Sequence, residues 1–212
     1  MTDVYLVRHC ETVANDEHRF AGAFDADVSE RGKKQLEYLS EAFKDIHLDK
    51  VYSSSRIRAR KTAIAINKYS GAPMEIDDAF HEVRLGDWEG QIVEDIIHSE
   101  AWRKWVNFPE TATAPNGESR EEELARGWAG LIKVVKENEG KTIAIATHGD
   151  ILRNLCQVLL KMPRNKLVEV AVPDNVAINH IRFNTLDDWD VLTYNDTRHL
   201  PESMITHWIE RG

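Results

Sequence analysis

The sequence contains few cysteines, has a deficit of positive charge and lacks a long apolar run. Its two cysteines among 212 residues, Cys10 and Cys156, lie far apart and fit reduced thiols better than a disulfide framework. No stretch reaches the roughly 18 consecutive apolar residues of a membrane-spanning helix. Lysine and arginine number 27 against 36 acidic residues, a formal net charge of −9. This balance argues against nucleic acid as a partner, because binding to nucleic acid depends on clustered positive charge.

The beginning of the chain and its length predict a simple organisation. The first residues form a strand pattern at Asp3–Val7, with no charged leader or apolar signal core before it. We therefore expect a cytoplasmic protein with no membrane partner. A length of 212 residues suits one buried core. We expect a single domain over residues 1–212, and both a monomer and a homodimer are compatible with the sequence.

Short apolar runs alternate with segments of helical periodicity. The runs Val4–Val7, Lys50–Tyr52 and Thr142–Ala146 are each followed by such a segment, which is typical of strands buried on both faces of a parallel sheet. Two more strands are expected at Val176–Phe183 and Asp190–Tyr194. The predicted fold class is α/β, a three-layer αβα sandwich with a mainly parallel central sheet and helices on both faces.

A small helical cap is expected at about residues 91–117. It contains Trp102, Trp105 and Phe108, and Trp88 lies just before it. Aromatic residues at this density either pack a pair of helices together or line the entrance of a pocket. In the second case they favour a substrate with an apolar or ring-bearing leaving group, and the sequence leaves both interpretations open.

Three of the expected strands end in polar residues that suit a phosphate. Arg8 and His9 follow the first strand, Ser53–Ser55 and then Arg58 follow the second, and Thr147–Gly149 follow the third. Parallel strands bring their carboxyl ends to one edge of a sheet, so we expect these residues to converge. Arginine offers permanent forked donors to phosphate oxygens, while a neutral imidazole can attack phosphorus. The sequence therefore predicts a phosphate-handling site.

Several motifs follow one another along almost the whole chain. The first is Val7–Thr12 with Asn15, in which Arg8-His9-Cys10-Glu11-Thr12 stands close to an Arg-His-Gly-Glu-Thr signature. The others are Tyr52-Ser53-Ser54, Arg58-Ala59, Thr62-Ala63, His81-Glu82, Gly86-Asp87-Trp88-Glu89-Gly90, Gly117-Glu118-Ser119, Thr147-His148-Gly149 and Asn195-Asp196 with His199-Leu200. In content and order these motifs resemble those of the histidine phosphatase, or phosphoglycerate-mutase-like, superfamily.

This resemblance implies roles for individual residues. His9 would be the nucleophile and form a phosphohistidine, and the nearby Arg8 and Arg58 would disfavour its protonated form. Glu82 would donate a proton to the leaving oxygen and afterwards activate a water molecule. The remaining phosphate or substrate contacts would be His148, Asn15, Gly22, Arg84 and Gly149, the last at the start of a helix whose free N–H groups would face the anion.

The predicted function is hydrolysis of a small phosphorylated metabolite, a phosphomonoester, without a cofactor. No metal is expected either, because the two arginines would repel a cation. One alternative is a cofactor-dependent phosphoglycerate mutase, which needs extra basic residues in the cap to hold a second anionic group. Between Glu82 and Glu118 the basic residues are Arg84, Arg103 and Lys104, so hydrolysis is favoured.

A second alternative is an inactive relative that only binds phosphorylated ligands. Such a protein would keep the arginines and lose the nucleophile or the acid, whereas His9, Glu82 and His148 are all present.

Two details stay open in the sequence. Arg84 could equally be an exposed ion-pair partner. Cys10, which replaces the signature's glycine, could be an acidified thiol that peroxide oxidises, or a small buried filler. The remaining histidines are expected to be surface or structural residues.

Overall fold

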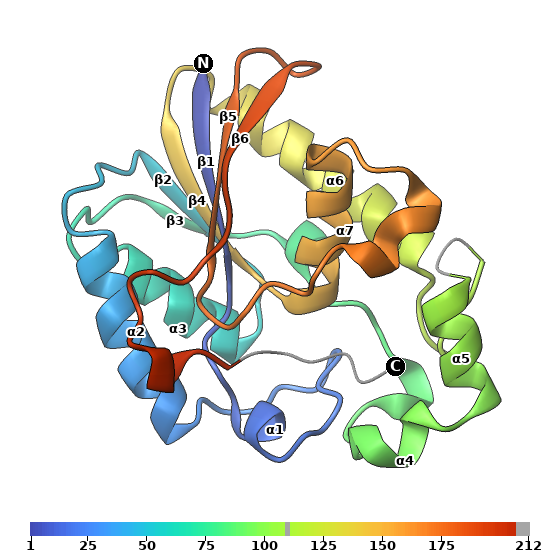
Figure 1. The fold of residues 1–212 in the computed structure, drawn as a ribbon. Helices are drawn as coiled ribbons and strands as arrows, with labels where there is room; N and C mark the ends of the chain where they lie inside the picture. The colour runs from blue at the N-terminus through green and yellow to red at the C-terminus, as the bar shows by residue number, and fades with distance from the viewer. Residues whose placement is uncertain (109–110, 207–212) are drawn as a thin grey trace.

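A six-stranded sheet forms the centre of the computed structural model, which describes residues 1–108 and 111–206 (Figure 1). Its strand order is β3-β2-β4-β1-β5-β6. The first four strands in this order run parallel to one another, whereas β5 pairs antiparallel with both β1 and β6. The strands are β1 (Thr2–Arg8), β2 (Lys50–Ser53), β3 (Met74–Ile76), β4 (Thr142–Thr147), β5 (Ile178–Phe183) and β6 (Trp189–Asp196). The mainly parallel sheet predicted from the sequence is confirmed.

Helices cover both faces of this sheet. The α-helices within the described ranges are α1 (Val13–Asp16), α2 (Glu30–Ala42), α3 (Ile57–Ile66), α4 (Val93–Ile97), α5 (Glu100–Asn107), α6 (Arg120–Glu137) and α7 (Gly149–Leu159). Short 3₁₀ turns are η1 (Asp78–Phe80), η2 (Gly86–Trp88), η3 (Arg164–Glu169) and η4 (Glu202–Met204). Ser29 caps α2 by accepting from the amide of Gly32, and Ser119 caps α6 by accepting from that of Glu122.

The side chains of the central strands alternate between two hydrophobic cores. In β4, Ile143 and Ile145 pack with α6 and α7 on one face, while Ala144 and Ala146 pack with α2 and α3 on the other. All four are fully buried. Burial on both faces explains why the central strands appear in the sequence as continuous apolar runs. The three-layer sandwich is visible in Figure 1, with α2 and α3 on one side and α6 and α7 on the other.

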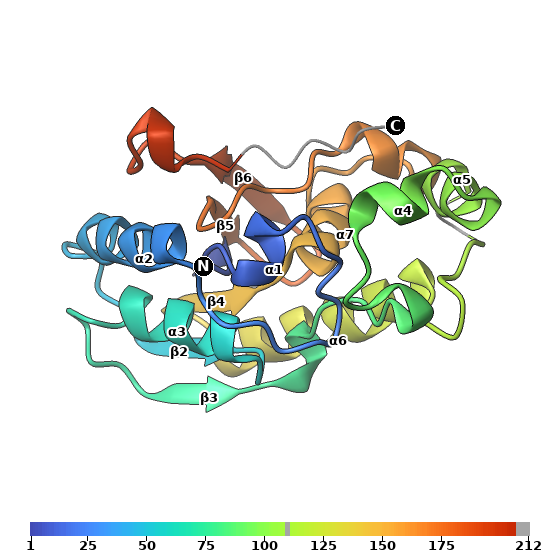
Figure 2. The same ribbon diagram turned by 90° about the horizontal axis from the view of Figure 1, so that it is seen from below.

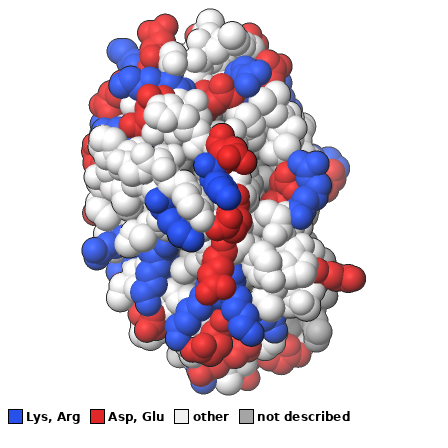
Figure 3. All heavy atoms as spheres, turned by 90° about the vertical axis from the view of Figure 1, so that its left-hand side faces the viewer, with Lys and Arg blue, Asp and Glu red and all other residues white. Residues whose placement is uncertain are grey.

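Acidic and basic side chains are mixed on the outer side of α2 and α3, the face seen in Figure 3. Among the ion pairs of this region are Lys33 with Glu30 and Lys61 with Asp27.

No helix within residues 1–108 and 111–206 is long and apolar enough to cross a membrane.

Two features of the sheet differ from the sequence prediction. The edge strand β3 was not predicted, because its three residues, Met74, Glu75 and Ile76, are all exposed and give no pattern of burial. The strand expected from Val176 begins at Ile178 instead. Val176 has a φ of 55°, a left-handed conformation that does not fit an extended strand.

The helices α4 and α5 lie within the expected cap segment, beyond the ends of the central strands (Figures 1 and 2). Trp105 of α5 forms a separate small core with Phe20 and Trp88, and Val93 and Ile96 of α4 pack against it. Trp88 lies 5.8 Å from both Trp102 and Trp105 between ring centroids. Most cap aromatics therefore pack against one another, whereas Phe108 is 61% exposed.

Candidate active site

The carboxyl ends of β1 and β4 place two histidines side by side. Arg8 is the register partner of Thr147, and the His9 amide donates to the Thr147 carbonyl over 2.8 Å. The next residue along each strand is therefore a histidine, and the rings of His9 and His148 have centroids 5.2 Å apart. The convergence of strand ends expected from the sequence is what the fold produces.

His9 is held in one tautomer by a backbone carbonyl. Its Nδ1 lies 2.6 Å from the Cys10 oxygen, and since a carbonyl can only accept, Nδ1 of the neutral ring carries the hydrogen. The lone pair is then on Nε2. Burial and the charges of Arg58 and Arg8 lower the pKa of His9 well below its ordinary value, so the ring is neutral near pH 7. The side-chain Nδ2 of Asn175 donates to the His9 carbonyl over 2.9 Å and fixes the main chain.

Arg58 is a buried cation whose position is set by three contacts. Its Nη1 donates to the carbonyl of Phe24 over 2.7 Å, and its Nη2 donates to that of Gly22 over 2.8 Å. Its Nε donates to Nδ1 of His148 over 3.1 Å. Burial lowers the pKa of Arg58 to about 10, which leaves it charged at neutral pH. Arg8, 4% exposed, donates to the Pro173 carbonyl over 2.7 Å.

Gly22, whose carbonyl accepts a hydrogen bond from Arg58, lies in the loop before α2. It has a φ of 49°, and a Cβ atom there would lie 2.8 Å from Oε1 of Glu89. That same carboxylate oxygen accepts from the amides of Ala23 and Leu85. Only glycine satisfies both the conformation and the close approach. Gly22 also lines the cavity described below.

His148 is fully buried, and its contacts determine its tautomer. Because Nδ1 accepts from Arg58, the hydrogen of the neutral ring is on Nε2, which lies 2.8 Å from Oγ of Ser54. Ser54 lies 3.3 Å in turn from Nδ1 of His81. Burial and then the charge of Arg58 lower the pKa of His148 well below its ordinary value. His148 is therefore a neutral ring that is directed by its neighbours.

The carboxylate of Glu82 occupies the N-terminus of α7. It accepts from the amides of Gly149 at 2.9 Å, Asp150 at 3.1 Å and Ile151 at 3.2 Å. The expectation that these N–H groups are free for an anion is thus corrected, since a side chain of the protein takes them. Burial and the charge of Asp150 raise the pKa of Glu82 against the opposing effect of Arg58. A carboxyl group in this setting can carry a proton at higher pH than an exposed one.

A cavity of about 560 Å³ opens above these groups. Arg8, His9, Glu82, Asn15 and Gly149 all line it. Arg58 and His148 are not among the lining residues. They lie behind them, and Arg58 donates to the carbonyl of the lining residue Gly22. Apolar residues also line the cavity, among them Phe20, Leu85, Ile92, Val93, Ile97, Trp102, Trp105 and Val172.

The chain was compared with protein families and with proteins of known structure. A model described as the histidine phosphatase superfamily, branch 1, matches residues 4–197. The chain belongs to this superfamily. Phosphoserine phosphatase 1 of Hydrogenobacter thermophilus is 31% identical over 204 residues, covering 95% of this chain and 96% of that protein. Phosphoglycerate mutase-like protein 4 of Arabidopsis thaliana is 28% identical over 206 residues, covering 95% of this chain and 88% of that protein.

Solved structures superpose on almost the whole chain. YhfR of Bacillus stearothermophilus has a TM-score of 0.88 at 26% identity, with 94% of this chain and 99% of that chain covered. A phosphoserine phosphatase of Entamoeba histolytica, crystallised as a histidine-to-alanine mutant with phosphoserine, has a TM-score of 0.84 at 25% identity. That match covers 95% of this chain and all of the other. The fold predicted from the sequence is confirmed.

Asn15 and Arg84 differ in how the structure places them in this histidine phosphatase. Asn15 directs its amide oxygen to the amide and hydroxyl of Thr12, at 3.1 and 3.0 Å, and faces the cavity. The side chain of Arg84 is 65% exposed and lies 3.9 Å from Glu118. Arg84 is not among the residues that line the cavity, and its position fits the exposed ion-pair partner that the sequence also allowed. A contact between Arg84 and substrate stays a prediction.

Other charged residues of the cavity were missed in the sequence. Arg31 lies 3.3 Å from Glu11, while Arg120 lies 3.5 Å from Asp150 and 4.4 Å from the ring of Trp105. Both arginines occupy first turns of helices, where the sequence pattern indicates a solvent-exposed face. His18, expected to be a surface or structural residue, also lines the cavity. His207 lies outside the described residues.

Cys10 is a buried filler and not a reactive thiol. It is fully buried, its amide donates to Oγ1 of Thr62 over 3.0 Å, and it is not among the residues with positive φ. A glycine is therefore not needed at this position. Burial raises the pKa of the Cys10 thiol to about 12, which leaves almost no thiolate at neutral pH.

Mild peroxide should therefore leave phosphatase activity unchanged, contrary to the acidified-thiol interpretation. The thiol is both inaccessible and protonated, so it lacks the two properties that oxidation requires. The measurement is the initial rate after peroxide treatment, together with the mass of the peptide that contains Cys10. Reversible inhibition that tracks oxidation of Cys10, and disappears in Cys10→Ala, would contradict this prediction.

Proposed function

We propose that this protein hydrolyses phosphomonoesters through a phosphohistidine formed on His9, and that it needs no metal ion. The observation that carries the proposal is the tautomer of His9. Its Nδ1–H is bound to a carbonyl, so Nε2 has a free lone pair beside two buried arginines. A neutral imidazole in such a position is a competent nucleophile for phosphorus.

The reaction would proceed in two balanced steps. In the first, Nε2 of His9 bonds to phosphorus, the ester P–O bond breaks, and Glu82 gives its proton to the leaving oxygen. Arg8 and Arg58 offset the charge on the phosphoryl oxygens. In the second, the Glu82 carboxylate takes a proton from water, whose oxygen bonds to phosphorus. The P–N bond then breaks, which releases phosphate and restores His9.

We further propose that residues 91–117 act as a cap that selects the leaving group. The support is the set of apolar residues that line the cavity together with His9, among them Trp102 and Ile97 from the cap helices. An apolar lining of this kind suits an apolar or ring-bearing leaving group. The substrate would be a small phosphorylated metabolite. Phosphoserine is one candidate, because two of the similar proteins are phosphoserine phosphatases.

Mutase activity is less well supported by the charges around the cavity. A mutase must hold a second strongly anionic group, which calls for arginines without a nearby carboxylate. Here Arg31 faces Glu11 and Arg120 faces Asp150, at 3.3 and 3.5 Å. The cations beyond the His9 pocket are thus largely offset, which favours water over a second substrate anion as the acceptor.

A panel of phosphomonoesters tests the proposal. It includes an aryl phosphate, a sugar phosphate, phosphoserine and 3-phosphoglycerate, each with and without EDTA and 2,3-bisphosphoglycerate. We expect release of phosphate that EDTA does not reduce, with the highest kcat/KM for the aryl ester. Isomerisation of phosphoglycerate that depends on bisphosphoglycerate would instead establish a mutase. Loss of activity in EDTA, restored by a divalent cation, would contradict metal independence.

A further inference from the structure

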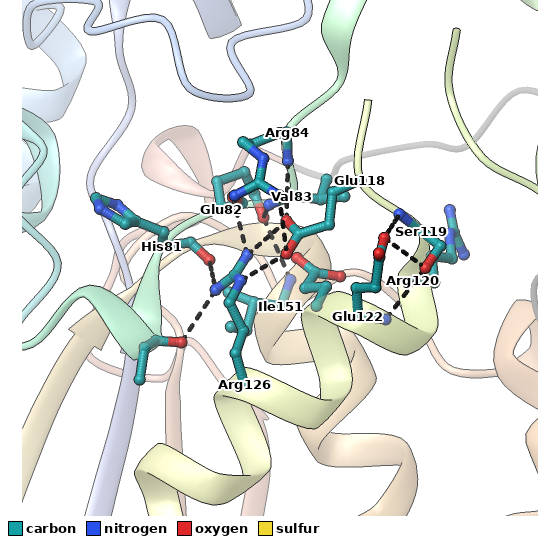
Figure 4. Close-up of polar contacts among 12 residues, drawn as sticks. His81, Glu82, Val83, Arg84, Glu118, Ser119, Arg120, Glu122, Arg126 and Ile151 are labelled. Carbon is teal, nitrogen blue, oxygen red and sulfur yellow. Dashed lines mark hydrogen bonds and ion pairs between the residues drawn. The ribbon is translucent and has the colours of Figure 1, made fainter. Parts of the chain in front are cut away.

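Arg126 of α6 does not line the cavity, yet every N–H group of its guanidinium has a hydrogen-bond acceptor close to the proposed acid, Glu82. Nη1 donates to the carbonyls of Ala79 and His81 at 3.0 and 2.8 Å, and Nη2 donates to the carbonyl of Glu82 at 3.1 Å. Nε and Nη2 also donate to the two oxygens of Glu118, at 2.8 and 2.9 Å. Arginine has five N–H donors, and all five have an acceptor here. Figure 4 shows this side chain reaching from α6 to the segment 81–84.

Glu118 extends the same contact to the other side of Glu82. Its carboxylate accepts from the Arg84 amide over 3.3 Å, and its own amide donates to the Arg84 carbonyl over 2.8 Å. Glu118 is 2% exposed. Burial alone would raise the pKa of Glu118, but the hydrogen bonds and charge of Arg126 outweigh it and lower that pKa. The pair is therefore an ionised, bidentate unit that binds backbone on both sides of Glu82.

The segment that carries Glu82 needs this support because it has no regular structure of its own. Residues 81–85 connect two 3₁₀ turns, η1 and η2, without joining the sheet. Their carbonyls would otherwise lack the partners that a strand or helix provides. The side chain of Glu82 is held separately by the first amides of α7. Its backbone thus depends on α6 and its carboxylate on α7.

We propose that Arg126, acting with Glu118, is a positioning residue that holds Glu82 where it can protonate the leaving oxygen. This inference rests on the proposed role of Glu82 as the acid. Arg8 ends β1, His9 follows it directly and Arg58 belongs to α3, and none of the three makes these contacts. Loss of the Arg126 contacts therefore misplaces the acid while the phosphate-binding groups stay in position.

The test compares substrates whose leaving groups differ in their need for a proton. A p-nitrophenolate leaves phosphorus without help, whereas the alkoxide of glycerol phosphate does not. The variant Arg126→Lys keeps the positive charge beside Glu118 but loses the planar fork. Its kcat/KM for glycerol phosphate should fall at least about tenfold, a fraction of the roughly 10²–10⁴-fold that general acid catalysis contributes as a whole. The value for p-nitrophenyl phosphate should fall less than about threefold, and the inhibition constant of inorganic phosphate should not change.

Matched variants separate this effect from damage to the fold. Arg182→Met removes another arginine that binds a carboxylate, that of Asp3 on the distant β1–β5 pair. This variant should keep the wild-type kcat/KM for both substrates. The double variant Arg126→Met with Glu118→Gln removes the buried charge as well and should show the same selective loss. Thermal unfolding of each variant verifies that it is folded.

The outcomes distinguish two failures. Glu82→Gln should show the same selectivity between substrates as Arg126→Lys, with a larger loss. If Glu82→Gln affects both esters equally, the role of Glu82 as acid is wrong. If Glu82→Gln is selective but the folded Arg126 variants lose both activities equally, or lose neither, the positioning role of Arg126 is wrong.

Discussion

Replacement of His9 by alanine should reduce turnover of every phosphomonoester by at least about 10⁴-fold, the scale seen when a covalent nucleophile is removed. No neighbouring group can take over its task. The ring next to His9, that of His148, has Nδ1 bound to Arg58 and Nε2 next to Ser54, so neither nitrogen offers a lone pair to a substrate. The measurement is kcat/KM on a substrate of the panel.

A trapping experiment makes this prediction specific to chemistry. Wild-type protein quenched in alkali during turnover of a ³²P-labelled substrate should carry an acid-labile phosphoryl group, and His9→Ala should carry none. Inorganic phosphate should still inhibit or bind the variant, because Arg8 and Arg58 do not depend on the imidazole for their position. His47→Ala, at a histidine whose side chain is 83% exposed, is the matched control and should be fully active. Activity of His9→Ala within tenfold of wild type would exclude the phosphohistidine route.

The strand ends could be read from the sequence because they depend on topology alone. Once Val4–Val7 and Thr142–Ala146 are buried parallel strands, the residues that follow them must meet at one edge of the sheet. That placed His9 and His148 together without knowledge of any loop. The edge strand β3 could not be predicted, because none of its side chains is buried.

The residues that the sequence did not reveal are those whose partners come from a separate element. Arg120 and Arg31 lie in the first turns of helices and appear solvated in a helical pattern, but Arg120 packs against Trp105 and Arg31 pairs with Glu11, and both line the cavity. Arg126 likewise faces a loop whose path no periodicity specifies. The occupation of the α7 N-terminus by Glu82 has the same origin, since it depends on where residues 81–85 pass.

The pH dependence of kcat/KM should be bell-shaped, with its acidic limb at lower pH and its alkaline limb at higher pH than ordinary pKa values of the two groups would give. His9 must be neutral to attack, so activity rises with pH through the pKa of His9, which burial, Arg58 and Arg8 hold well below its usual value of about 6.5. Glu82 must be protonated to act as acid, so activity falls as pH rises through the pKa of Glu82, which burial and Asp150 raise. The profile is measured with glycerol phosphate, whose alkoxide requires the proton.

Glu82→Gln isolates the second limb of that profile. The amide cannot titrate or donate an acidic proton, so kcat/KM for glycerol phosphate should fall by about 10²–10⁴, the usual contribution of general acid catalysis. The decline at high pH should disappear, while the rise through the pKa of His9 should remain. Glu37→Gln, the same change at an exposed position on α2, should keep both limbs and the full rate. An alkaline limb that persists unchanged in Glu82→Gln would show that another group supplies the proton. Asp150, which lies at the α7 N-terminus and lines the same cavity, would then be the next residue to test.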